Sequence, residues 1–140
     1  MHCRVFARFR DKAAGHFPFA VLRHEVGAHL DAVIGGNPWN GSALVYAYTG
    51  RKALFPHVGG AYDDERLLIG QGFARSADTM CAAVHDKKMT YVIDFGDRYL
   101  FGSDARAGGF PGFDNLQESS AVTLVAERGA ARLYRVVACS

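Results

Sequence analysis

The sequence has few residues that could cross-link or stiffen the chain: three cysteines, four prolines and one tryptophan among 140 residues. The cysteines are Cys3, Cys81 and Cys139, an odd number at wide spacing and without a CxxC pair. This pattern argues against a disulfide framework and favours free thiols in a reducing compartment. We therefore expect a cytoplasmic protein without disulfide bonds.

Long apolar runs and targeting signals are also missing. No stretch approaches the roughly 20 apolar residues that a membrane-spanning helix requires. The first residues, Met1-His2-Cys3-Arg4, lead into charged residues rather than into the apolar segment of a signal peptide. We expect no membrane association, and export through a route that leaves no cleavable signal stays open.

Neither sign of charge dominates, because the formal net charge is only +2. A dedicated nucleic-acid-binding domain carries a strongly basic stripe, so nucleic acid is not an expected partner. A third hypothesis for function rests on Arg4, Arg8 and Arg10, which share one face of a predicted strand. Binding to DNA or RNA at low salt would test it.

No phosphate-binding or metal-binding motif is intact. Neither Gly-x-x-x-x-Gly-Lys-Ser/Thr nor Gly-x-Gly-x-x-Gly occurs, so nucleotide binding has no support. His24 and His29 are five residues apart, whereas the zinc-protease helix needs a spacing of four. Asp63-Asp64-Glu65 lacks the alternating ligands of a calcium loop. We expect no cofactor and no metal.

Hydrophobic residues make up 49% of the chain, enough for a full core, and many of them alternate with period two. The clearest segment is residues 89–95, where Met89, Tyr91, Ile93 and Phe95 fall on one face of a predicted strand. Gly96-Asp97 supplies a two-residue turn into a return strand over residues 98–101. A hairpin this apolar must pack against other elements.

The remaining segments complete the fold prediction. Further strands are predicted over residues 3–10, 17–23, 43–49, 121–127 and 131–138. Residues 24–34 favour a short helix, residues 53–72 mostly a loop, and residues 76–88 either a helix or a strand. Short connections favour antiparallel pairing. The predicted fold class is α+β, mainly antiparallel β: one domain over residues 1–140, built as a sandwich or partly closed barrel with one or two short helices.

Aromatic residues in glycine- and proline-rich segments give the leading hypothesis for function. Loops over residues 35–42, 56–65 and 104–113 contain four of them: Trp39, Tyr62, Phe110 and Phe113. Loop aromatics either anchor an interface or cover the ends of a β core. The first reading predicts a small soluble binding domain whose partner is a protein or a small molecule.

The alternative is a cysteine-dependent hydrolase or deamidase with Cys81 as the nucleophile. A thiol nucleophile needs an imidazole within hydrogen-bonding reach. His85 meets this condition if residues 77–87 are helical, because side chains four residues apart are then neighbours. Asp94 or Asp78 would orient the base. A buried structural cysteine is the competing interpretation.

Overall fold

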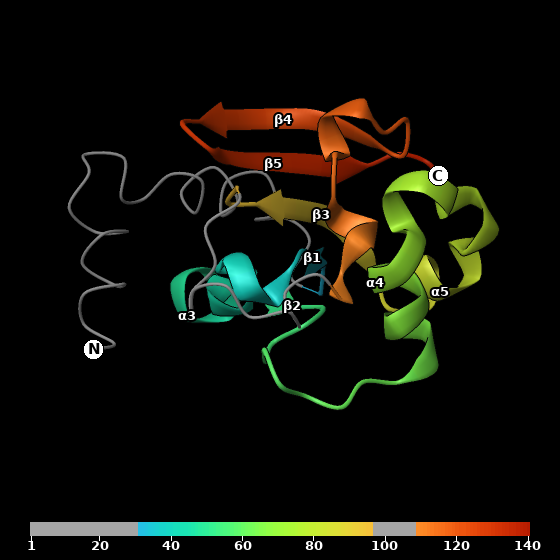
Figure 1. The fold of residues 1–140 in the computed structure, drawn as a ribbon, viewed down its shortest axis with the longest axis horizontal. Helices are drawn as coiled ribbons and strands as arrows, with labels where there is room; N and C mark the ends of the chain where they lie inside the picture. Colours follow the sequence, from blue (N-terminus) through green and yellow to red (C-terminus); the bar gives the residue numbers. More distant parts are fainter. Residues whose placement is uncertain (1–30, 97–108) are drawn as a thin grey trace.

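The computed structural model describes residues 31–96 and 109–140, so the strands predicted over residues 3–10, 17–23 and 98–101 lie outside it. The described part is built on one five-stranded sheet with the order β2-β1-β3-β5-β4 (Figure 1). Its strands are β1 (Val33–Gly35), β2 (Lys52–Ala53), β3 (Met89–Asp94), β4 (Val122–Arg128) and β5 (Ala131–Val136).

The sheet is mixed, so the prediction of a mainly antiparallel sandwich or barrel is wrong. Strand β1 pairs in parallel with both β2 and β3, whereas β5 is antiparallel to β3 and to β4. Parallel neighbours cannot be joined by a tight turn and need a crossover. Helical segments that the sequence pattern did not reveal supply these crossovers.

In the part of the chain that the structure describes, three α-helices and several short 3-10 helices connect the strands. They are η1 (Pro38–Asn40), η2 (Ser42–Leu44), α3 (Val45–Thr49), α4 (Asp64–Ser76), η3 (Ala77–Thr79), α5 (Cys81–Asp86), η5 (Pro111–Phe113) and η6 (Leu116–Glu118). Figure 1 shows α4 and α5 together and α3 apart from them, beside β1 and β2.

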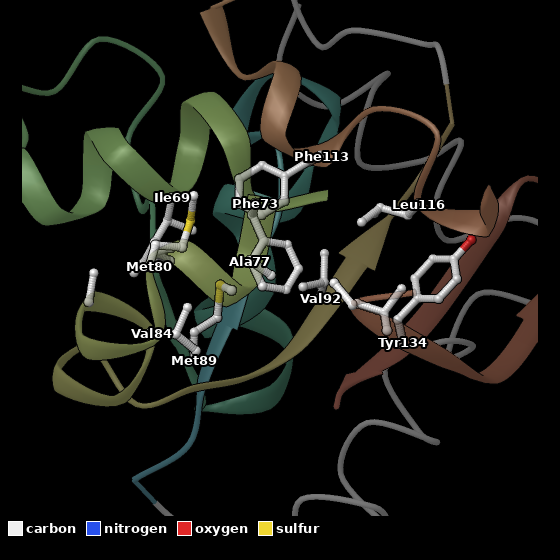
Figure 2. Packing of buried hydrophobic residues seen from close by; sticks show 14 of the residues in the cluster. Ile69, Phe73, Ala77, Met80, Val84, Met89, Val92, Phe113, Leu116 and Tyr134 are labelled. Carbon is white, nitrogen blue, oxygen red and sulfur yellow. The ribbon is translucent and has the colours of Figure 1, made fainter. Parts of the chain in front are cut away.

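Two apolar clusters lie on the two faces of the sheet. The larger joins α4, η3, α5 and η5 to Val92 and Tyr134 of the sheet, and Figure 2 shows these side chains in contact. The smaller joins Val45 of α3 to Ile34, Ile93 and Leu133. The connection from β1 to β2 therefore covers one face, and the connection from β2 to β3 covers the other.

Two predicted segments are confirmed. Residues 89–94 form β3, which is buried on both faces because it is the central strand of the sheet. The predicted hairpin near the C-terminus is β4 and β5, which pair in antiparallel register from Val122 with Val136 to Arg128 with Ala131.

The strand predicted over residues 43–49 is wrong, because this segment forms η2 and α3. Val45 is fully buried, and the Thr49 hydroxyl donates to its carbonyl oxygen at 2.7 Å. Gly50 then ends the helix with a φ of 69°, a left-handed conformation that suits glycine. The β-branched and aromatic side chains here favoured a strand, and tertiary packing overrides that preference.

The loop predicted over most of residues 53–72 is present at residues 54–63, but residues 64–72 form most of α4 instead. Asp63 caps this helix by accepting a hydrogen bond from the Arg66 backbone amide at 2.9 Å. Ile69 and Phe73 lie four residues apart on the buried face. Gly70 and Gly72 conceal this stripe in the sequence, since glycine lowers helix propensity.

The helical predictions over residues 76–88 and 24–34 have different outcomes. Residues 81–86 form α5, so the helix is the correct one of the two alternatives for residues 76–88. Residues 24–30 lie outside the described ranges, and the end of the predicted 24–34 helix is instead β1.

The expectation of unpaired cysteines is wrong as well. Cys81 in α5 and Cys139 near the C-terminus form a disulfide, with their Cα atoms 5.3 Å apart. The two residues are separated by 58 positions in sequence. Only the packing of β5 and the following segment against α5 brings them together, so their sequence spacing carries no signal.

Candidate ligand pocket

A polar pocket of about 590 Å³ opens where β1 and β3 end. Its lining residues come from three places: Asn37 and Asn40 of the η1 segment; Asp94, Gly96, Ala130 and Arg132 at the end of the sheet; and Phe113, Asp114, Asn115 and Gln117 between η5 and η6. The pocket therefore joins segments that lie far apart in the sequence.

The topology of the sheet explains this position. Strands β1 and β3 are parallel neighbours, so their carboxyl ends lie side by side. The chain leaves β1 through α3 on one face, whereas η5 and η6, the described elements that follow β3 in sequence, pack on the other. Such a divergence opens a crevice at the carboxyl ends of parallel strands, the usual place for ligands in open α/β sheets.

The sheet contributes one carboxylate and one guanidinium to the pocket. Asp94 ends β3 and lies directly opposite Arg132 of β5 in the antiparallel register. Asp94 lies two residues after Val92, and Arg132 lies two residues before Tyr134. Both are therefore on the sheet face that packs against α4 and α5. Asp94 and Arg132 therefore place opposite charges next to each other at the pocket.

The η1 segment contributes two buried carboxamides, each only 6% exposed. Asn37 caps η1, because its side-chain oxygen accepts a hydrogen bond from the Trp39 backbone amide at 3.0 Å. The Asn40 carboxamide donates to Asp94 Oδ1 at 3.4 Å and to the Gly96 carbonyl oxygen at 3.5 Å. Asp94 Oδ1 also accepts from the Gly96 amide at 2.8 Å. These contacts fix η1 against the end of β3.

The third wall lies between η5 and η6 and is mostly exposed. Asp114, Asn115 and Gln117 present their side chains to solvent, whereas Phe113 is buried in the larger core cluster. Asn115 has a φ of 52°, a left-handed conformation that asparagine tolerates better than most residues. This wall is anchored by its apolar residues and offers polar groups to a ligand.

The surroundings raise the pKa values of two groups at the sheet end, Arg132 and Tyr134. Arg132 donates to Glu127 of β4, and this carboxylate raises the pKa of the guanidinium. Burial raises the pKa of the Tyr134 hydroxyl, on the same face as Arg132. Arg132 is therefore a permanent cation that is already partly neutralised by Glu127.

The four predicted binding aromatics are not a set of exposed anchors. Trp39 is 2% exposed and Phe113 is 5% exposed, so both belong to the core. Phe110 and Tyr62 are half-buried and pack edge-to-face on Phe55, each with ring centres 4.9 Å from it. Tyr62, Phe110 and Phe113 therefore belong to the larger apolar cluster, and a binding role for the four aromatics stays a prediction.

Of the three predicted catalytic residues, Cys81 and His85 lie four residues apart on α5, as the helical alternative required, whereas Asp94 lies elsewhere, at the end of β3 in the sheet. Cys81 is bonded to Cys139, so it has no thiolate while the disulfide is intact. The His85 ring contacts the Cys139 carbonyl oxygen and faces a shallow pocket beside Lys88 and Met89. Asp94 lies in the polar pocket described above.

Sequence reasoning included the 35–42 loop, which contains Asn37 and Asn40, in the predicted contact surface and named Phe113 as a binding residue, and all three line the pocket. It chose that loop for Trp39 and not for its asparagines, and Arg132 attracted no functional hypothesis, since a polar residue on a terminal hairpin is common. The local signal was Asn37-Pro38, a carboxamide before a proline, which is typical of a capped turn. No local signal indicates that this turn meets the end of β3.

Within the described residues, we find no helix with the length and apolar character needed to cross a membrane.

Comparisons with known proteins give a family and a fold. The sequence model of a family described as a family of unknown function (DUF6541) matches residues 22–138. No curated protein sequence matches the chain. Among solved structures, the C-terminal globular domain of an oligosaccharyltransferase from Archaeoglobus fulgidus is similar, with a TM-score of 0.57 and 12% sequence identity. The likeness covers 90% of this chain and 98% of that one, and at this identity it shows a shared fold.

Proposed function

The chain belongs to this family of unknown function (DUF6541), and we propose that it is a binding domain whose ligand occupies the polar pocket at the ends of β1 and β3. The observation that carries this proposal is the convergence of Asp94, Arg132 and Asn40 from three segments on one crevice. A ligand site typically has a small number of precisely placed polar groups. In open α/β sheets it typically lies at the carboxyl ends of adjacent parallel strands whose connections diverge.

The similar domain supports a role within a larger sugar-transferring system. That domain is the C-terminal globular domain of an oligosaccharyltransferase, and we infer that this chain contributes recognition rather than a bond-breaking step. Among the described residues that line the pocket there is no cysteine or histidine, so they supply neither a thiol nucleophile nor an imidazole base.

The disulfide supports an oxidising compartment as the place of action. Disulfides persist outside the cytosol, where thiols are not kept reduced. The Cys81–Cys139 bond therefore weighs against the cytoplasmic location that the cysteine count favoured. Mass spectrometry of the protein isolated from its native cells under acid quench would test this: a cross-linked peptide pair is expected, and two free thiols would contradict it.

An NMR fragment screen tests the binding role. The probes are small neutral sugars, amino-acid amides and capped dipeptides, each added to the ¹⁵N-labelled protein. We expect at least one class to shift the backbone amides of Asn40, Gly96 and Ala130 together. Exclusive shifts at residues remote from the pocket, or none with any probe, would contradict the proposal.

A matched pair of exposed aspartates separates the pocket from general charge effects. Asp114→Asn changes a pocket residue, and Asp78→Asn makes the same change on η3, far along the chain from the pocket lining. Both side chains are exposed, so neither variant should unfold the protein. Only Asp114→Asn should weaken binding, and equal weakening by both would count against the pocket.

A further inference from the structure

The hydrogen-bonding groups of the pocket are both donors and acceptors. Arg132 can only donate, Asp94 and Asp114 can only accept, and the three asparagines and Gln117 can do both. Hydroxyl groups on a ligand can likewise donate to one neighbour and accept from another. The lining therefore suits a ligand with several hydroxyl groups.

Asn40 positions the sheet end of the pocket. Its Oδ1 atom accepts no hydrogen bond from the described residues, but it is buried from the pocket as well as from solvent. Its amide group donates to Asp94 Oδ1 and to the Gly96 carbonyl oxygen. Asn40 therefore fixes Asp94 at the pocket and leaves the contacts with a ligand to its neighbours.

The charges at the sheet end of the pocket are compensated within the protein. Arg132 is paired with Glu127, so it does not offer the free cation that a phosphate or carboxylate ligand would need. Asp94 already accepts from Asn40 and from the Gly96 amide, which together neutralise part of its charge. Asp114 adds a second carboxylate on the exposed wall, so the pocket favours an uncharged ligand over an anion.

The sheet topology disfavours an extended peptide. Peptides that bind to sheets usually pair with a free strand edge. The edges of the described sheet are β2 and β4, whereas the strands that end at the pocket are β1, β3 and β5. These three strands already have neighbours on both sides, so no backbone edge at the pocket is free for pairing.

We propose that the ligand of this pocket is a neutral saccharide, bound through its hydroxyl groups by Asp94 and Arg132 at the sheet end and by Asp114 and Gln117 on the exposed wall. This inference rests on the proposed binding function and names its ligand class. The volume of about 590 Å³ lies within the range of about 300–1,000 Å³ typical of small-ligand sites, which is enough for a short oligosaccharide.

The test combines a glycan array with NMR. The full chain is applied to an array of neutral and acidic oligosaccharides, and the strongest neutral and acidic glycans and a set of capped, uncharged tripeptides are then titrated into ¹⁵N-labelled protein. We expect a neutral glycan to shift the Asn40, Gly96 and Ala130 amides, and Gln117→Ala and Asp114→Asn each to weaken it at least five-fold. Asp78→Asn should leave the affinity unchanged.

Two contrary results are distinguishable. If tripeptides or acidic glycans shift the pocket amides and neutral glycans do not, the saccharide inference is overturned while the binding pocket stands. If no probe shifts the pocket amides, or if neutral glycans bind only elsewhere, both the inference and the pocket proposal fail.

Discussion

At the scale of single residues, burial decides what the aromatic side chains do. Trp39 lies in a Gly-Gly-Asn-Pro-Trp-Asn-Gly segment whose composition indicates an exposed loop, yet it is 2% exposed. The segment turns inward because Asn37 caps η1 and Asn40 ties it to the end of β3. Trp39 is therefore a buried part of the segment that forms this wall of the pocket.

Trp39→Ala should lower the free energy of unfolding by about 3–5 kcal/mol, as large-to-small changes of buried aromatic residues do. Denaturant unfolding followed by circular dichroism measures this loss. Tyr46→Ala is the matched control, because Tyr46 is 63% exposed and its removal should cost less than about 1 kcal/mol. Similar losses in the two variants would place Trp39 outside the core.

Asp63 should make stability sensitive to acid. Its hydrogen bond from the Arg66 amide, together with Lys87 and the Arg66 side chain, lowers its pKa from 3.8 to about 2. A carboxyl group whose pKa is lowered by folding stabilises the protein above its unfolded pKa and loses this contribution as the pH falls through its folded pKa. The contribution is therefore complete above about pH 4 and disappears by about pH 2.

Asp63→Asn tests the charge separately from the cap, because asparagine is an equally good helix cap. Thermal melting between pH 2 and pH 6 should show the wild type more stable at pH 6, with the difference vanishing near pH 2. Asp63→Ala removes the cap as well and should remain less stable at every pH. A pH-independent difference between wild type and Asp63→Asn would refute the assignment.

At the scale of elements, the contact between η5 and α4 holds one wall of the pocket. A Cβ atom at Gly112 would lie 2.3 Å from the Ile69 carbonyl oxygen and 2.8 Å from the Phe73 amide nitrogen, both of them backbone atoms of α4. Backbone cannot move aside as a side chain can. Only glycine allows this close approach, so the position of the 113–117 wall depends on it.

Gly112→Ala should destabilise the protein by about 1–3 kcal/mol, the usual range for overpacking, and should displace the pocket wall. Chemical denaturation gives the first quantity, and chemical-shift changes at Asn115 and Gln117 report the second. Gly59→Ala is the control, since a Cβ atom there meets nothing within 4 Å. An unchanged stability for Gly112→Ala would mean that η5 does not pack tightly on α4.

At the scale of the whole molecule, the disulfide joins the end of the chain to the helical layer. Cys139 follows β5 and Cys81 begins α5, so the bond connects the C-terminal hairpin to the helices on the larger core face. A cross-link over 58 residues stabilises by restricting the unfolded chain, by about 4 kcal/mol in the chain-entropy description.

Cys139→Ser should therefore lower the free energy of unfolding by about 2–4 kcal/mol, and Cys81→Ser should do the same. The double variant should lose no more than either single variant, because one bond is removed in all three. Melting with and without dithiothreitol provides the check: the reductant should destabilise only the wild type. Insensitivity of the wild type would show that the two thiols are not bonded.

The sequence by itself determined two segments, because the signals that identify them lie within a few neighbouring residues. The alternation of residues 89–94 and the turn between residues 128 and 131 identified β3 and the terminal hairpin, since side-chain period and turn chemistry act over a few residues. Strand propensity misled the prediction at residues 43–49, where the burial of Val45 on a helix outweighs it.

Only the tertiary structure decided the parallel order of β1, β2 and β3, the Cys81–Cys139 bond and the pocket. Each depends on residues tens of positions apart, such as Asn40 and Asp94, that meet because crossover helices bring parallel strand ends together. Local propensity and residue spacing do not predict such contacts between distant segments. The contacts arise because both faces of one sheet are buried. The chemistry of this protein lies where those distant segments converge.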